Sequence, residues 1–111
     1  MDFIGRGSEN SADYSLVQDS SFGKHCHFTV KGRVSLNESS HLEAALVKAA
    51  EAGYTEIVID MSLVSQLSSV GIRVLLSMHK RMKKINGRLR IENPSENVKN
   101  VIGMIALDEL L

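Results

Sequence analysis

Apolar and polar residues change their spacing along the chain, and each spacing predicts one kind of element. Residues 25–31 alternate between apolar and polar side chains, which is typical of a strand with one buried face. Residues 14–18 are a candidate for an earlier strand, and residues 19–24 between the two carry turn chemistry. We therefore expect a hairpin of two strands, the second of which ends at Gly32.

Two later segments have the three-to-four-residue apolar spacing of amphipathic helices. The first covers residues 36–52 and has Gly53 just past its end, where a glycine commonly terminates a helix. The second covers residues 70–86 and is the clearest helix of the chain, with Ser68 or Ser69 placed to cap its start. The candidates for the cap of the first helix are Asn37, Ser39 and Ser40.

The segments around these helices predict two more strands and a third helix. Residues 56–61 are almost continuously apolar, as expected of a central strand that is buried on both faces. Residues 89–92 predict a short strand. A third helix is expected to open at Asn93-Pro94, because proline is favoured near the first helical position.

This order of elements predicts an α/β fold, since strand–helix–strand units produce parallel pairing with right-handed crossovers. We expect a single domain with a mixed, mostly parallel sheet of four to five strands and three or so helices mainly on one face. The strand face that carries His25 and His27 would then stay partly open. The chain has 111 residues, which suits one domain, and we expect a flexible tail at residues 1–12 and the domain at 13–111.

Apolar run length, the N-terminal sequence and the cysteine count indicate the cellular compartment. No apolar run approaches the ~20 residues that a membrane helix needs, so we expect no direct insertion into a membrane. The N-terminus lacks the basic and apolar regions of a signal peptide. Cys26 is the single cysteine and cannot form an internal disulfide, which favours a reducing compartment. We therefore expect a cytoplasmic protein.

Charge is balanced overall but unevenly placed. The chain has 13 basic and 13 acidic residues, yet residues 61–91 contain no Asp or Glu. Two interpretations stay open for this basic stretch: a solvated helix face, or a surface that binds an acidic partner. Nucleic acid is not expected as a partner, because the whole chain is neutral and has no interleaved aromatic residues. The basic residues of the stretch are Arg73, Lys80, Arg81, Lys83, Lys84, Arg88 and Arg90.

Signals for catalysis are weak. The sequence has no glycine-rich phosphate loop, and its four histidines form no local catalytic pattern. His25 and His27 share one strand face and have the spacing of a two-histidine metal site, but Cys26 between them is expected on the opposite face, and no acidic or cysteine co-ligand lies nearby on their own face. Solvated strand histidines are the preferred interpretation. We expect a non-enzymatic protein without a metal or a cofactor.

The most informative polar residues follow the buried strand of residues 56–61. Asp60 and Ser62 lie at its end, and Ser68 and Ser69 lie where the clearest helix begins. A serine before a helix is ordinarily a cap, and an aspartate in this place ordinarily accepts hydrogen bonds from the next loop. A helix start also favours negative charge, so an exposed hydroxyl there suits phosphorylation equally well.

Several stretches together carry a resemblance to a known family. Residues 30–34 and 42–46 are similar to its strand, glycine turn and first helix, and residues 57–62 are similar to its strand ending in Asp-Leu-Ser. Residues 67–72 are similar to its Asp-Ser-Ser-Gly-Leu switch loop, and residues 103–111 fit its C-terminal tail. In their order and spacing these stretches resemble the STAS domain of bacterial anti-sigma-factor antagonists.

The resemblance covers about residues 14–111 and implies a mechanism. Proteins of this type bind a serine-kinase anti-sigma factor, lose that binding when the kinase phosphorylates a serine at the start of the second helix, and regain it through a phosphatase. By this resemblance the acceptor is Ser69, and Ser68, which stands where the family usually has Asp, adds a second candidate hydroxyl. The implied switch loop and partner surface comprise Asp60, Ser62, Ser68, Ser69, Gly71 and Arg73.

Two other functions stay open beside the antagonist. One is a STAS accessory subunit of a membrane transport complex, which would require no phosphorylation. The other is a non-catalytic sensor of a nucleotide or another small ligand, which would be stabilised thermally by that ligand. For the antagonist we expect a monomer or a weak dimer.

Overall fold

The structure is a computed structural model that describes residues 14–104. Its sheet has four strands in the order β1-β2-β3-β4: β1 (Tyr14–Phe22), β2 (His25–Val34), β3 (Glu56–Leu67) and β4 (Arg88–Glu92). β1 pairs with β2 antiparallel, and the two other pairs are parallel. This confirms the predicted α/β fold with a mixed, mostly parallel sheet. The expectations for residues 1–12 and 105–111 lie outside the described residues.

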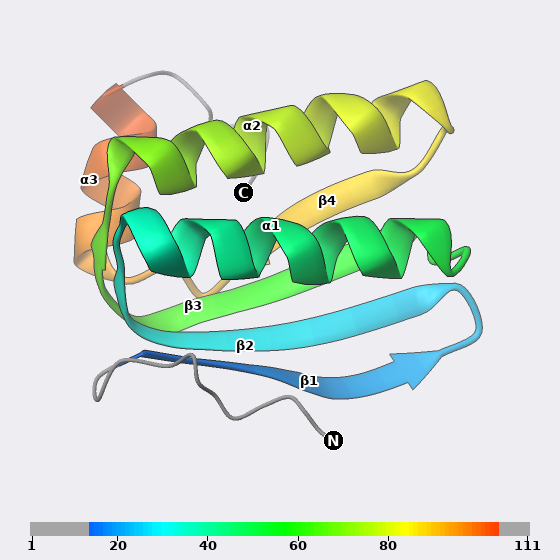
Figure 1. Cartoon of the computed structure of the whole chain (residues 1–111), viewed down its shortest axis with the longest axis horizontal. Coiled ribbons are helices and arrows are strands. Elements are labelled where there is room, and N and C mark those ends of the chain that lie inside the picture. The colour runs from blue at the N-terminus through cyan, green and yellow to red at the C-terminus, as the bar shows by residue number, and fades with distance from the viewer. Residues whose placement is uncertain (1–13, 105–111) are drawn as a thin grey trace.

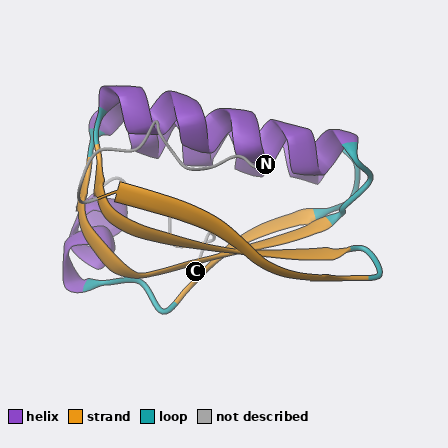
Figure 2. Ribbon diagram, turned by 60° about the horizontal axis from the view of Figure 1, so that its bottom comes forward, coloured by secondary structure: helices purple, strands orange, loops and turns teal. Residues whose placement is uncertain are grey.

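Three described helices complete the fold: α1 (Leu36–Glu51), α2 (Ser69–Lys84) and α3 (Glu96–Met104). α1 and α2 lie side by side on one face of the sheet, and α3 lies at the end of the molecule where α1 and α2 begin (Figures 1 and 2). The core fills the space between the two long helices and the sheet. Its fully buried large side chains include Leu42, Leu46, Ile57, Ile59, Met61, Leu75, Met82 and Leu89.

β2 and β3 are longer than the sequence predicted. We expected β2 to end at Gly32, but it continues through Gly32, which has a positive φ of 86°, to Val34. β3 runs on to Leu67 in place of the expected loop, because its second half pairs in parallel with the end of β2 and buries Val64 and Leu67. β3 therefore extends beyond β4 and delivers the chain directly to the start of α2.

β1 also exceeds its predicted bounds. It pairs with β2 as far as Phe22, so the turn expected over residues 19–24 is reduced to Gly23 and Lys24. The register shifts between Gln18 and Ser20, so β1 is irregular where it carries Asp19. The positive φ of Gly23, 59°, is a conformation that glycine adopts readily.

The sequence predicted the start of α1 at Leu36 correctly but not its cap, and it misplaced the start of α3. The N-cap of α1 is Ser35, whose hydroxyl donates to Glu38, and not Asn37, Ser39 or Ser40. α3 begins after Ser95, whose Oγ accepts from the Val98 amide at 3.3 Å. The hydroxyl of Ser95 also donates to the carbonyl of Val64 at 2.7 Å, so this start is held against β3.

The glycine predicted to end the first helix is confirmed, whereas α2 ends at Lys84, two residues before the predicted bound. Gly53 follows α1 with a positive φ of 102°, and Asn86 follows α2 with a positive φ of 59°. Such left-handed residues commonly terminate helices. None of the helices in residues 14–104 is long and apolar enough to cross a bilayer.

Candidate functional site

Ser68 is the residue at which β3 gives way to α2. Its backbone is extended, with φ −74° and ψ 165°, and its amide donates to the carbonyl of Val34 at 3.0 Å. Its hydroxyl oxygen accepts from the amide of Gly71 at 3.1 Å, and its carbonyl accepts from the amide of Ile72 at 2.9 Å. Of the two candidates, Ser68 is therefore the N-cap of α2.

The Ser68 hydroxyl also meets α1. The Oγ atom of Ser39 lies 3.3 Å from that of Ser68 and donates to the carbonyl of Ser35 at 2.6 Å. Ser39 is fully buried, and Ser68, which lies against it, is half-exposed. The first turns of α1 and α2 are thus joined through two serine side chains.

Gly71 permits this close contact between the helices. A Cβ atom added to Gly71 would lie 2.8 Å from Leu67 Cδ1, 3.2 Å from Ser39 Oγ and 3.3 Å from Val34 Cγ1. The glycine is needed here for space, because the side of α2 that it occupies is filled by its neighbours. Gly71 itself is buried.

Ser69 is the first helical residue of α2, and it is exposed. Arg73 follows one helical turn later and is also exposed. Side chains four residues apart on a helix are neighbours, with Cβ atoms roughly 5–6 Å apart. The partial positive charge of a helix N-terminus favours an anion at the same place. A phosphate on Ser69 would therefore meet two favourable groups without burial.

Asp60 and Ser62 occupy a different place. Asp60 Oδ1 accepts from the Ser62 amide at 2.9 Å and from the Ser62 hydroxyl at 2.7 Å, while Oδ2 accepts from Asn93 Nδ2 at 3.2 Å. Partial burial alone would raise the pKa of Asp60, but these hydrogen bonds, with the nearby His27, hold it below its ordinary value. Leu67 lies seven residues further along β3, roughly 20 Å away.

The six residues of the predicted switch loop thus lie in two groups. Ser68, Ser69, Gly71 and Arg73 are together at the start of α2, a group that we call the α2 start. Asp60 and Ser62 lie midway along β3, beside the end of β4. Asp60 satisfies polar groups of the segment that follows it, as the structural interpretation of the sequence had it.

His27 is the centre of a second polar cluster, on the sheet face opposite α1 and α2. Its Nδ1 lies 2.9 Å from Asp19 Oδ2, and its Nε2 lies 3.3 Å from Glu92 Oε1. Partial burial would lower the pKa of His27, but the hydrogen bonds and charges of Glu92 and Asp19 together raise it. Within residues 14–104, no group of three or more His, Cys, Asp or Glu side chains is arranged to hold a metal ion.

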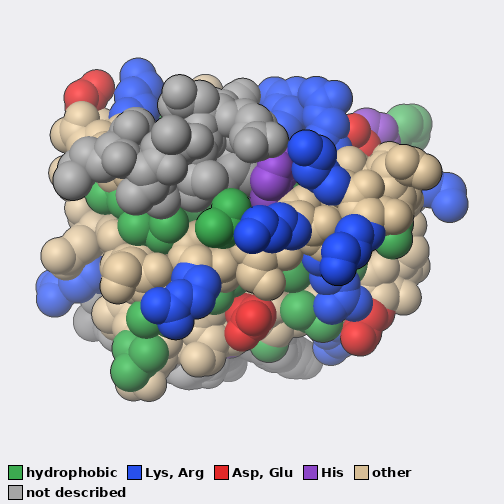
Figure 3. Space-filling view, turned by 90° about the horizontal axis from the view of Figure 1, so that it is seen from above, with side chains coloured by type: hydrophobic (Ala, Val, Ile, Leu, Met, Phe, Trp, Pro, Cys, Tyr) green, Lys and Arg blue, Asp and Glu red, His purple; other side chains and the backbone are tan. Residues whose placement is uncertain are grey.

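The basic stretch forms part of the exposed surface of α2. Exposed residues recur every three to four positions from Ser69 toward the end of the helix, and Figure 3, which looks down on the helical side, shows Lys and Arg side chains gathered there. Arg81 lies 3.9 Å from Glu51 of α1, which neutralises part of this surface. The positions of the exposed stripe that begins at Ser69 are Arg73, Ser77, Lys80 and Lys84.

Sequence reasoning missed Ser39 as a contact of the α2 start. The available signal was its place three residues before Leu42, which puts it on the buried stripe of α1 with Leu46 and Ala49. A serine on such a stripe is expected to find a hydrogen-bond partner within the fold. The identity of that partner depends on how α1 and α2 pack.

The strand order, the two helices on one face and the serine-bearing start of α2 define this chain as a STAS-type α/β domain. The chain belongs to the family described as "Mlab, STAS domain", whose model matches residues 17–111.

Solved structures of known antagonists share the fold. The anti-sigma factor antagonist SpoIIAA in its unphosphorylated form is 19% identical, with a TM-score of 0.74 over 87% of this chain and 84% of that one. An anti-sigma factor antagonist from Mycobacterium paratuberculosis is 23% identical, with a TM-score of 0.69 over 86% of this chain and 81% of that one.

A curated relative is similar in sequence. The putative anti-sigma factor antagonist BtrV of Bordetella bronchiseptica (strain ATCC BAA-588 / NCTC 13252 / RB50) is 28% identical over 72 residues. The match covers 65% of this chain and 62% of BtrV, so it spans less than two thirds of that relative.

Proposed function

We propose that this protein is an anti-sigma-factor antagonist of a partner-switching system. It binds a serine-kinase anti-sigma factor, and phosphorylation of Ser69 ends that binding until a cognate phosphatase removes the phosphate. The observation that carries the proposal is the exposed hydroxyl of Ser69 at the first position of α2. The similarity to BtrV, whose name describes a putative antagonist, supports it. The role is one of binding in the cytoplasm and requires no catalysis by this chain.

The contacts of the two serines favour Ser69 over Ser68 as the acceptor. The Ser68 hydroxyl is engaged with the Gly71 amide and lies against the buried Ser39. A kinase would have to disrupt these contacts before it could hold the Ser68 hydroxyl in line for transfer, and the phosphate would then have no room beside Ser39. Ser69 is exposed and needs no such rearrangement.

The charge of a phosphate on Ser69 would be sufficient to prevent partner binding. A phosphoserine adds nearly two negative charges at neutral pH. In the free protein the helix dipole and Arg73 stabilise those charges, whereas at a docked surface they would lose water and face any acidic group of the partner. A penalty of about 4 kcal/mol lowers affinity by roughly a thousandfold, so no large conformational change is required.

The test is phosphopeptide mapping of the protein from its native cells with phosphatases inhibited, followed by binding to the captured kinase. Phosphate on Ser69 is expected, and Ser69→Asp should abolish binding while the domain stays folded. Ser69→Ala should bind and resist phosphorylation. Ser21→Asp is the matched control, since Ser21 is an exposed serine on β1, away from the exposed stripe of α2. Unmodified Ser69 under all growth conditions, with full affinity of Ser69→Asp, would contradict the proposal.

An accessory subunit of a membrane transport complex is the second candidate. Two observations favour it: the matching family model carries the name Mlab, and Ser68 replaces the Asp expected before the acceptor of an antagonist. In this case the α2 start would be a constitutive docking surface. Affinity capture from native membranes would then recover an ATPase or a transporter, and the captured protein would carry no phosphate on Ser69.

A further inference from the structure

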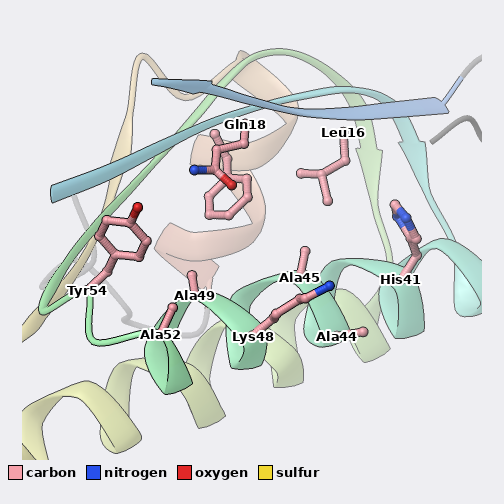
Figure 4. A pocket seen from close by; sticks show the side chains of 10 residues that line it. Leu16, Gln18, His41, Ala44, Ala45, Lys48, Ala49, Ala52 and Tyr54 are labelled. Atoms are coloured by element: carbon pink, nitrogen blue, oxygen red, sulfur yellow. The ribbon is translucent and has the colours of Figure 1, made fainter. Parts of the chain in front are cut away.

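A groove of about 840 Å³ lies between β1 and α1, outside the α2 start (Figure 4). Leu16 and Gln18 point into it from β1, and His41 and Tyr54 lie at its two ends. Its volume falls within the range of small-molecule sites, about 300–1,000 Å³. The side chains that line it are Leu16, Gln18, Phe28, His41, Ala44, Ala45, Lys48, Ala49, Ala52 and Tyr54.

The groove exists because α1 presents small side chains toward β1. Its bulky residues Leu42 and Leu46 are fully buried in the core, whereas alanines face the edge strand. Leu16 of β1 is only half-buried, although it lies against the hydrophobic core. The result is an apolar surface on both sides of the groove that the described helices leave open.

Among the described residues that line the groove, Lys48 is the lysine that supplies a positive charge, and Gln18 and Tyr54 are neutral polar residues. Lys48 lies along its α1 side, and its long side chain runs over the alanines (Figure 4). The Nδ1 atom of His41 lies 2.9 Å from the hydroxyl of Tyr14, which fixes the ring at one end. Within residues 14–104, none of the ten side chains that line the groove is acidic. An apolar slot with a lysine beside it is complementary to a ligand that has an apolar chain and an anionic head.

We propose that this groove binds a single-chain amphiphile with a carboxylate head. The alkyl chain lies between Leu16 and Phe28 of the sheet and Ala45 and Ala49 of α1, and the head group pairs with Lys48. From His41 to Ala49 the helix rises about 12 Å, which suits a chain of medium length. The site contains none of the residues of the α2 start, so it stands independently of the proposed function.

The probe is decanoate below its micellar concentration, titrated into the full chain and followed by methyl and amide NMR. Saturable shifts are expected at Leu16, Ala45 and Ala49. Decyltrimethylammonium, which has the same chain and the opposite charge, should bind about tenfold more weakly, and propionate should not bind. Lys48→Ala should weaken decanoate binding by about fivefold, the size of one partly exposed ion pair.

Two further variants complete the design. Lys84→Ala removes an exposed lysine of α2 and should leave decanoate affinity unchanged. Ala45→Leu fills the groove and should abolish binding, with folding checked by circular dichroism; if it does not fold, the two lysine variants still decide.

Absence of saturable binding, equal affinity for both head groups, or equal effects of the two lysine variants would overturn the proposal. It would also be overturned if contacts in the ligand-free protein showed the groove filled by residues 1–13 or by a second copy of the chain.

Discussion

Ser68→Ala tests whether the two adjacent serines have different roles. The substitution removes the hydrogen bond from the Gly71 amide to Ser68 Oγ, 3.1 Å long, and leaves that amide without its cap. Loss of an N-cap hydroxyl costs about 1 kcal/mol of stability. Ser39 keeps its bond to the Ser35 carbonyl at 2.6 Å, so no second penalty is added. We expect the free energy of unfolding to fall by ~1 kcal/mol.

The assay is equilibrium unfolding in urea, followed by circular dichroism. With an m-value of about 1.5 kcal/mol/M, the expected loss lowers the midpoint by roughly 0.7 M at unchanged slope. Ser69→Ala is the matched control, because it removes the same hydroxyl from the next, exposed position. Exposed substitutions of this kind usually change stability by less than about 0.5 kcal/mol.

Ser68→Asp separates the cap from other roles of the hydroxyl. Aspartate caps helices as well as serine does and adds a favourable charge at the N-terminus. We expect this variant to be as stable as the parent protein, and more stable than Ser68→Ala. The reasoning is refuted if Ser69→Ala is the more damaging of the two alanine variants, or if Ser68→Asp is as unstable as Ser68→Ala.

Three further predictions concern packing, pH and charge. Gly71→Ala should lower the free energy of unfolding by about 1 kcal/mol in urea titrations. The reason is that the strain of a Cβ atom 2.8 Å from Leu67 Cδ1 exceeds the gain in helix propensity, and a stabilised variant would contradict this. Because the pKa of His27 is raised in the folded state, its protonated form should stabilise the fold below pH ~6.5, and this stability should be lost as pH rises through the folded pKa. The contribution should be under about 1 kcal/mol. His27→Gln should therefore flatten the decline of the unfolding midpoint between about pH 6.5 and 8. Reversal of Lys80 and Lys84 to Glu should weaken kinase binding in titration calorimetry, and more so at low salt; unchanged affinity would identify this face as merely solvated.

Local periodicity was enough to predict the elements and their order. The spacing of apolar residues reflects which face each segment buries. It predicted a strand for residues 25–31 and a helix for residues 70–86, and both are present with the expected face buried. The end of β3 could not be obtained in this way. Residues 63–67 do not alternate cleanly, and the parallel pairing with β2 shifts register there. Their strand character comes from pairing partners 32 to 33 residues earlier in the chain.

The candidate site shows the same division. The cap at Ser68 follows from local chemistry, since a hydroxyl before a helix accepts from the backbone of its first turn. The contact with Ser39 depends on how α1 and α2 cross, and its partners are 29 residues apart. His27 had no acidic neighbour in sequence, yet β-pairing brings Asp19 from β1 and Glu92 from β4 to its two ring nitrogens. Neither the Ser39–Ser68 contact nor the His27 cluster can be predicted from residues that are close neighbours in the sequence.

The serine at position 68 changes the electrostatics of the proposed switch without changing its fold. Aspartate and serine cap a helix equally well, so replacing the family's usual acid by Ser68 preserves the start of α2. An aspartate there would set a negative charge beside a phosphate on Ser69 and oppose it. With Ser68, the helix dipole and Arg73 act on that phosphate with no adjacent acid in residues 61–91. The substitution therefore favours the phosphorylated state of the free protein, which is the state that the proposed mechanism releases from its partner.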